Sequence, residues 1–307
     1  MTAAAILAVE PQTRAWARMR AGRTVSVLTF VIAILIIWYA AAIWANGPQT
    51  QMALANADAH PNALGYVLAT WARDRPIVPA PHQVVVDFVK STLFVAPNTN
   101  RSLIFHAWVT LSSTLVGFII GTLLGILLAA AIVHVRSLDK SLMPWIISSQ
   151  TVPILAIAPM VIVVLGSIGL TGLFPKAVIS PYLSFFPVTV GMVKGLRSPA
   201  PIHLDLMRTY SASRWQVFWK LRFPASVPFL FISMRIAIAA SLVGAIVGEL
   251  PTGAQAGIGA RLLGGSYYGQ TLIIWSALFA AAIMAALLVG AVGLADRIVR
   301  VRMGARP

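Results

Sequence analysis

The sequence predicts an all-α membrane protein with six membrane-spanning helices. Of its 307 residues, 59% are hydrophobic and only 10% are charged, whereas about 25% are charged in soluble proteins. A bilayer core needs roughly 20 apolar residues in a helix, and six stretches of the chain approach or exceed that length. Cysteine is absent, which excludes disulfide bonds, thiolate metal sites and cysteine nucleophiles. The composition argues against a water-soluble enzyme.

The six predicted spans differ in regularity. The first, at 25–44, carries no charge, and neither does the third, within 141–175. The third contains Pro144, Pro153 and Pro159. These prolines predict a kinked or broken helix, because freed backbone groups are tolerated in lipid only where protein or a wet cavity satisfies them. The other spans are expected at about 107–133, 177–193, 226–250 and 271–294.

The basic residues indicate the orientation. The net charge is +15, from 23 Lys and Arg against 8 Asp and Glu. With the N-terminus inside, 16 of the 23 lie on the cytoplasmic side, namely Arg14, Arg18, Arg20, Arg23, Arg136, Lys140, Lys194, Arg197, Arg208, Arg214, Lys220, Arg222, Arg297, Arg300, Arg302 and Arg306. The 6 outside are Arg73, Arg75, Lys90, Arg101, Lys176 and Arg261, and Arg235 lies within a span. The positive-inside rule therefore places both termini in the cytoplasm and accounts for much of the charge without nucleic acid.

This topology divides the chain into four parts. We expect a cytoplasmic tail at 1–24, a first span with a long outer loop at 25–106, a helical core at 107–295 and a cytoplasmic tail at 296–307. The outer loop contains a possible short helix at 64–71. It also contains an amphipathic piece at 84–94, with apolar residues at helical spacing. That piece is either a surface helix at the membrane interface or a docking surface for an extracytoplasmic partner.

The cytoplasmic segment between the fourth and fifth spans is the most informative. It combines basic residues with large apolar ones such as Trp215 and Trp219. Ser213 with Gln216 matches a capping box, and Pro224 predicts a stop or bend. We therefore expect two short helices, at 202–210 and 214–221, joined by a tight turn at 211–212. Such a pair needs a surface to pack on, either a partner protein or anionic lipid.

The same segment resembles permease subunits of bacterial ATP-binding-cassette (ABC) importers. Their signature is Glu-Ala-Ala, three residues, Gly, nine residues, an aliphatic residue, one residue, then Leu-Pro. Here Asp205 stands at the Glu position, Ser211 at the Gly position and Pro224 at the Pro position, with Leu221 at the aliphatic one. The stretch SRWQVFWKLRFPASVPFLFISMRIA at 213–237 resembles the nitrate/sulfonate/taurine branch. Further matches are PAPHQVVVDF, PILAIAP, LFPKAVIS and GEL, and together they cover roughly 79–295.

The resemblance implies a type I (MetI-like) importer permease fold with a cytoplasmic coupling helix, in the bacterial cytoplasmic (inner) membrane. Two permease subunits, as a homodimer or a heterodimer, are expected to pair around a central path. An extracytoplasmic substrate-binding protein would deliver the solute. The segment 202–224, called the elbow below, would dock on an ABC ATPase subunit. Leu-Met in place of Ala-Ala, and Ser211 in place of Gly, leave room for a heterodimer whose other permease has the standard signature.

ATP chemistry is expected on a partner chain, because this one has no G-x-x-x-x-G-K-[ST] loop. The protein is thus expected to be a transporter subunit and no enzyme, with no catalytic residue, cofactor or metal site. Its five histidines are scattered and are expected at the surface or the interface. Lipid is an expected partner and nucleic acid is not. The residues implied for coupling are Asp205, Met207, Ser211, Ser213, Arg214, Trp215 and Pro224.

Candidates for the solute path lie in spans three and five. A polar cluster in span three either lines the path or forms hydrogen bonds between helices; it comprises Ser148, Ser149, Gln150 and Thr151. Arg235 and Glu249 in span five fall on nearly one helical stripe, about 21 Å apart. They mark either the two ends of the path or the membrane boundaries.

Two other groups of residues have two interpretations each. Gly117, Gly121 and Gly125 are spaced for close helix packing, with a glycine-lined path as the alternative. Tyr267 and Tyr268 form either an aromatic belt or part of an outer gate.

The expected solute is a small anion of nitrate, sulfonate or taurine type, or a small heteroaromatic such as a pyrimidine. The alternative function is an ion-gradient-driven secondary transporter, which would need paired half-repeats. No clear internal repeat is present.

Overall fold

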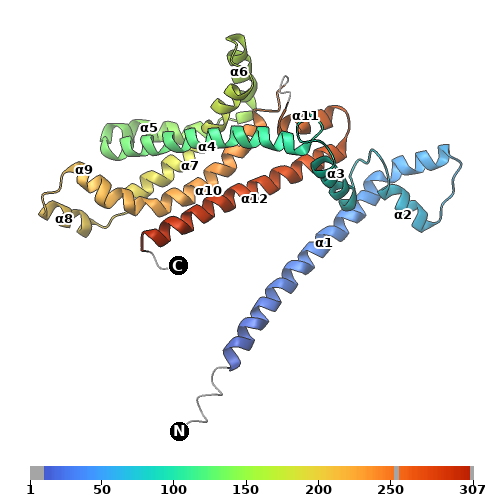
Figure 1. Ribbon diagram of the computed structural model, residues 1–307, viewed down its shortest axis with the longest axis horizontal. Coiled ribbons are helices and arrows are strands. Elements are labelled where there is room, and N and C mark those ends of the chain that lie inside the picture. Colours follow the sequence, from blue (N-terminus) through green and yellow to red (C-terminus); the bar gives the residue numbers. More distant parts are fainter. Residues whose placement is uncertain (1–9, 252–255, 305–307) are drawn as a thin grey trace, which may run out of the picture. The chain divides into compact units, whose positions relative to one another are not determined.

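The computed structural model describes residues 10–251 and 256–304, with backbone alone for 10–23, and every regular element in these ranges is helical (Figure 1). The elements are α1 (Glu10–Asn56), α2 (Ala63–Trp71), α3 (Pro81–Leu93), α4 (Leu103–His134), α5 (Arg136–Ser149), α6 (Ile154–Ser167), α7 (Leu173–Leu196), α8 (Pro201–Thr209), α9 (Arg214–Val217), the π-helical turn η1 (Phe218–Arg222), α10 (Phe223–Val247), α11 (Ile258–Tyr267) and α12 (Thr271–Arg302). Within these described ranges, five helices are long and apolar enough to cross a bilayer, and there are six if the bent pair α5–α6 is taken as one span. The predicted all-α, multi-span fold is confirmed.

The chain forms two compact units, Met1–Asp87 and Phe88–Pro307. In the first, α1 does not end at residue 44 as predicted but continues to Asn56. Tertiary hydrogen bonds explain the extension. The Trp38 indole donates to the Pro79 carbonyl at 2.9 Å, and the side-chain amide of Asn46 donates to the Val78 carbonyl at 2.8 Å. The helix beyond the apolar run therefore serves as a support for the following loop.

The third span is broken, as its prolines predicted. α5 and α6 meet at an angle of 96°, and Pro153 stands directly before α6 (Figure 1). A break leaves backbone carbonyls without helical partners. One of them, on Ser149, accepts a hydrogen bond from the Tyr182 hydroxyl of α7. Protein contacts thus satisfy part of the backbone that the break frees.

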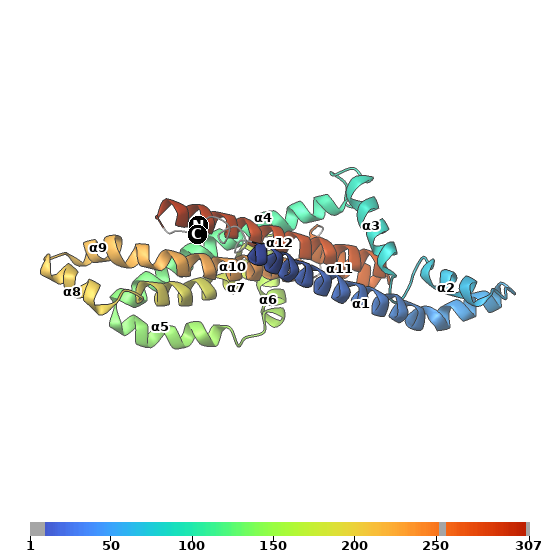
Figure 2. The ribbon, with the colours of Figure 1, turned by 90° about the horizontal axis from the view of Figure 1, so that it is seen from below.

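Three helices, α4, α7 and α10, form the centre of the second unit and lie side by side (Figures 1 and 2). Gly117, Gly121 and Gly125 of α4 are all buried. A Cβ added at Gly117 would overlap Ser180 of α7, and one added at Gly121 would overlap Ser184. Small residues let helices approach closely where packing, rather than water exclusion, drives association.

A chain of hydroxyl groups crosses the same contact. The Ser180 hydroxyl donates to the Ser241 carbonyl of α10 at 2.8 Å, and the Ser241 hydroxyl donates to the Thr114 carbonyl of α4 at 2.7 Å. All three side chains are fully buried. These bonds fix the relative register of the three helices, because each joins a side chain to the backbone of a neighbour.

The sixth span and the segment before it also differ from expectation. α12 runs to Arg302 rather than to about residue 294, because Asp296 and Arg300 form an ion pair within its last turns at 2.6 Å. α11 was not predicted. Its short, glycine-rich sequence, IGARLLGGSY, lacks a run of apolar residues long enough to be recognised.

Replacing Gly121 by Ala is expected to lower the stability of the protein by about 1–3 kcal/mol, the usual cost of overpacking. The added methyl group would overlap Ser184. Thermal unfolding in detergent measures the change. Gly290→Ala is the matched control, because no atom lies within 4 Å of the added Cβ there. Equal melting temperatures for the two variants would contradict the packing described.

Candidate functional site

The elbow lies at one end of the second unit (Figure 1). α8 starts at Pro201, and a proline in the first turn of a helix sacrifices no hydrogen bond. In the turn that follows, Ser211 has a φ of +50°, and its amide donates to the Arg208 carbonyl at 2.8 Å. This left-handed conformation is the one that glycine adopts without steric cost.

The capping box predicted at the start of the second elbow helix is confirmed. The backbone N–H of Gln216 donates to the Ser213 hydroxyl at 3.3 Å, and the backbone N–H of Ser213 donates to the Gln216 side-chain oxygen at 2.8 Å. The first turn of α9 is therefore stabilised by its own sequence.

A stop at Pro224 was one of the two predicted outcomes, and it does not occur. The helix runs without a break from Arg214 to Val247, 34 residues. Just before the proline it takes a π turn, in which the Phe223 amide donates to the Phe218 carbonyl. A π turn inserts one residue into the helical ladder. This turn and the position of Pro224 in the first turn of α10 let the helix continue without the proline N–H.

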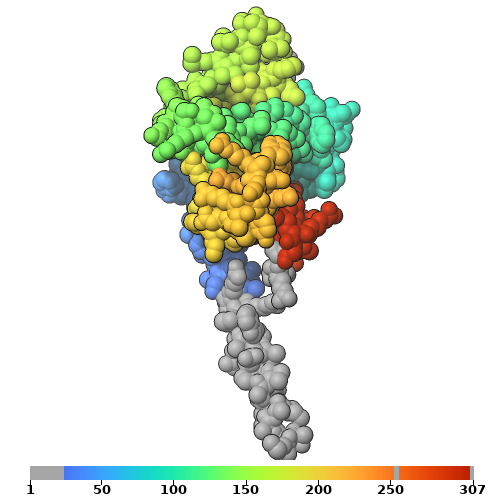
Figure 3. Space-filling view, turned by 90° about the vertical axis from the view of Figure 1, so that its left-hand side faces the viewer, coloured from blue at the N-terminus to red at the C-terminus, as the bar shows by residue number. Residues whose placement is uncertain are grey.

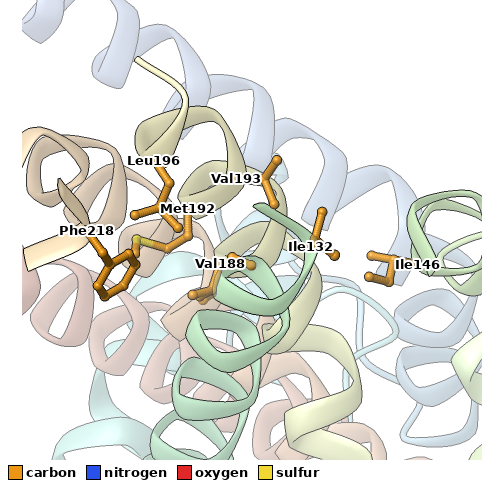
Figure 4. Close-up of a cluster of buried hydrophobic side chains, with 9 residues drawn as sticks. Ile132, Ile146, Val188, Met192, Val193, Leu196 and Phe218 are labelled. Atoms are coloured by element: carbon orange, nitrogen blue, oxygen red, sulfur yellow. The ribbon is translucent and has the colours of Figure 1, made fainter. Parts of the chain in front are cut away.

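Phe218 anchors the elbow to the rest of the unit. It is buried in a cluster with Met192 and Leu196 of α7 (Figure 4). Its ring also meets the His134 ring at the end of α4 edge-on, with centroids 5.2 Å apart. Through Phe218 the elbow therefore packs directly against α4 and α7.

Other side chains of the elbow are uncovered, including Trp215, whose ring stacks on that of Phe218 with centroids 6.3 Å apart. Trp215 is 70% exposed, Ile202 73% and Tyr210 76%. Figure 3 looks at this end of the molecule and shows the side chains of α8 and α9, in gold and orange, at its front. Exposed apolar side chains, together with the exposed Arg208 and Arg214, are typical of an interaction surface.

Most residues implied for coupling are accessible. The exposed ones are Asp205, Ser211, Ser213, Arg214 and Trp215, and the half-buried ones are Met207 and Pro224. Asp205 pairs with Arg208 at 2.9 Å, but an exposed pair of this kind adds little stability. A second, partly exposed pair, between Asp139 of α5 and Arg197 after α7, spans 2.9 Å.

The polar cluster of span three lies at the break between α5 and α6. Gln150 borders a pocket of about 430 Å³ that is also lined by Pro187 and Gly191 of α7 and by Ser233 and Ile236 of α10. Ser149 is half-buried, whereas Ser148 and Thr151 are exposed and their hydroxyls point to no other helix in the described hydrogen bonds. Gln150 is thus the member of the cluster that the structure places at a cavity.

Arg235 and Glu249, predicted on nearly one stripe of span five, form ion pairs with different helices. Arg235 pairs with the buried Asp296 of α12 at 2.6 Å, and Arg300 binds the other oxygen of that carboxylate at 2.6 Å. One buried acid thus joins α10 to α12. The sequence did not predict a role for Asp296, although it is one of only 8 acidic residues in the chain.

Glu249 is fully buried just after α10. Its carboxylate accepts hydrogen bonds from Lys176 of α7 at 3.0 Å and from the Thr110 hydroxyl of α4 at 2.8 Å. The sequence predicts Lys176 in an outer loop, whereas it lies in the first turns of α7. The available signal was a single lysine that interrupts an otherwise uncharged stretch of the chain.

His106 corrects the expectation that the histidines lie at the surface. It is 5% exposed, and its two ring nitrogens meet the Asn100 carbonyl at 2.9 Å and the Gly257 amide at 3.0 Å. The contact with Gly257 joins residues 151 apart in the chain, so spacing could not reveal it.

Known proteins resemble this chain over most of its length. Residues 121–304 match the protein family described as "Binding-protein-dependent transport system inner membrane component". A probable ABC transporter permease protein of Haemophilus influenzae is 30% identical over 70% of this chain and 85% of its own length. The formylaminopyrimidine transport permease protein of Halalkalibacterium halodurans is 30% identical over 60% of this chain and 68% of its own. The nitrate import permease protein of a Synechocystis species is 25% identical over 76% and 82%.

Replacing Ser211 by Gly is expected to raise the stability of the elbow by about 0.5–1 kcal/mol, because a side chain in the left-handed region is strained. Ser211→Val, with a β-branched side chain, should lower it. Hydrogen exchange of the amides of α8 and α9 measures both changes. A loss of protection in the glycine variant would contradict the strain inferred from the φ of +50°.

Proposed function

Because the chain belongs to the family of binding-protein-dependent transport system inner membrane components, we propose that it forms the solute path of an ABC importer and couples that path to a separate ATPase subunit. ATP hydrolysis takes place on the ATPase, and this chain supplies the moving membrane helices. The observation that carries the proposal is the elbow, in which Phe218 is buried against α7 while Trp215, stacked on it, is 70% exposed.

The elbow suits the transfer of mechanical force. A partner that binds the exposed side chains of Trp215, Ile202 and Tyr210 buries apolar area and excludes water. The capping box stabilises α9 before any partner binds, so little conformational entropy is lost on docking. Phe218 then transmits a displacement of the elbow to α4 and α7. ATP-driven closure of two ATPase subunits would thus shift the population between two packings of the spans.

The other partners follow from the family. We propose an extracytoplasmic substrate-binding protein that delivers the solute, and a second permease subunit that completes the path. This chain departs from the family signature at the Ala-Ala and Gly positions, so the second subunit is either an identical copy or a permease with the standard signature. The chain is a multi-pass protein of the inner membrane, and we propose that both termini lie in the cytoplasm.

For the solute, we propose a small anion or a small heteroaromatic such as a pyrimidine. The nitrate relative supports the first class, and the formylaminopyrimidine relative supports the second. The pocket at Gln150 favours the heteroaromatic, because none of the residues that line it is ionisable. A desolvated anion without a cation beside it would be costly.

Replacing Trp215 by Asp is expected to reduce the stimulation of ATP hydrolysis by loaded binding protein at least about tenfold, which corresponds to ~1.4 kcal/mol lost from an aromatic hot spot. The measurement uses proteoliposomes that contain the chain, its ATPase and its binding protein. Trp44→Asp is the matched control, since it makes the same chemical change at a residue of α1 that is 84% exposed and lies outside the elbow. Undiminished stimulation in the Trp215 variant would refute the coupling role.

The same proteoliposomes distinguish an importer from an ion-gradient-driven transporter. Uptake of nitrate, taurine and a pyrimidine is followed in parallel. We expect uptake to stop when ATP is withdrawn while the ion gradient is kept. Continued uptake would instead support the secondary transporter.

A further inference from the structure

The start of α11 is capped by side chains from other parts of the unit. The residue before the helix, Gly257, has no side chain, yet its amide donates to the His106 ring at 3.0 Å. The amides of the next two residues donate to the Thr110 hydroxyl at 2.8 Å and to the Glu249 carboxylate at 3.0 Å. The free N–H groups at a helix start are usually bound by the local sequence or by water. Here α4 and the end of α10 bind three of them in succession.

The carboxylate at the centre of this arrangement is fully enclosed. Glu249 is 0% exposed and Lys176 is 6% exposed. One carboxylate oxygen binds the Lys176 ammonium at 3.0 Å, while the other binds Thr110 at 2.8 Å and the Gly259 amide at 3.0 Å. The charges balance, and both oxygens are used. Four elements, α4, α7, α10 and α11, therefore meet at one ion pair.

Two glycines make the close approach possible. Gly257 has a φ of +125°, and a Cβ on it would overlap the Glu249 carboxylate. A Cβ on Gly259 would overlap the Ile246 carbonyl of α10. The backbone of α11 could not reach the carboxylate with ordinary residues at these positions.

The ion pair lies at the far end of the helix that starts in the elbow. That helix runs from Arg214 to Val247, 34 residues, which corresponds to about 50 Å. The elbow and α11 occupy opposite ends of the second unit (Figures 1 and 2). The same helix thus has Trp215 at one end and Glu249 just beyond the other.

We infer that Glu249 and Lys176 form a joint that fixes α11 to the outer end of the elbow helix, so that a displacement of the elbow reaches the outer face of the protein. Both residues are positioning residues. A buried ion pair adds little net stability compared with an apolar pair of the same volume. Its specific contribution is a fixed geometry, because each oxygen must meet its own donor. This inference rests on the coupling role proposed above.

Glu249→Gln leaves the shape of the joint intact but removes its charge, so Lys176 is buried without a counter-ion. In the assembled transporter, we expect the ratio of stimulated to basal ATP hydrolysis to fall at least about fivefold, the lower end of typical coupling between sites. Lys176→Met should do the same. The double variant Glu249→Gln, Lys176→Met should recover most of the ratio, because no unpaired charge remains and the Gln oxygen still accepts from Thr110 and Gly259.

Asp139→Asn is the matched control, since it makes the same chemical change at a partly exposed ion pair and should leave the ratio unchanged. If the double variant is as impaired as Lys176→Met alone, Lys176 contacts the solute or a partner directly and the joint is refuted. Equal ratios in the wild type and in Glu249→Gln would also refute it.

A distance measurement tests the joint without reference to transport. The chain has no cysteine, so spin labels can be placed at Tyr268→Cys, just after α11, and at Ile236→Cys, which is exposed on α10. We expect one narrow distance distribution in the otherwise unchanged chain and a broad one with Glu249→Gln. Equally narrow distributions would overturn the joint. If the wild-type complex shows no ATPase stimulation, the proposed function fails, and the distances still decide whether the joint exists.

Discussion

Close packing of α4, α7 and α10 is the constraint on which the other features depend. In lipid there is no water to expel from between helices, so association depends on contact and on hydrogen bonds. Gly117 and Gly121 bring α4 onto α7, and the hydroxyls of Ser180 and Ser241 bind backbone carbonyls across the contact. The elbow and the Glu249 ion pair are both attached to these three helices. Both ends of the second unit are therefore attached to the same three packed helices.

Charge is placed where helices must be joined at a defined position. The Asp296 carboxylate holds Arg235 of α10 and Arg300 of α12, and the Glu249 carboxylate holds Lys176 of α7. An unpaired charge within the membrane is expensive, so each of these acids is satisfied by at least one cation. The polar groups of the elbow, in contrast, are largely exposed. The interior pairs set geometry, while the exposed elbow surface remains available for a partner.

The sequence predicted the membrane spans, the broken third span and the capping box, because each depends on local periodicity, proline or a four-residue pattern. It missed α11, whose start is capped by His106, Thr110 and Glu249 rather than by its own residues. It also missed the partners of Arg235 and Glu249. Helical periodicity shows which face a residue occupies but does not identify the helix opposite, and Lys176 lies 73 residues from Glu249 in the chain. Of the two outcomes predicted for Pro224, a stop or a bend, the stop was wrong, because a π turn that lets the helix continue is not visible in residue types.

The contact between the elbow and an ATPase is tested most directly by cross-linking. Since the chain has no cysteine, Trp215→Cys introduces a single thiol at an exposed position of the elbow. With a short bifunctional cross-linker in membranes that contain the whole transporter, the account predicts one covalent product with the ATPase subunit. It also predicts that a membrane-impermeant maleimide added from outside does not label the thiol. Labelling from outside, or the absence of any product with the ATPase, would contradict the account.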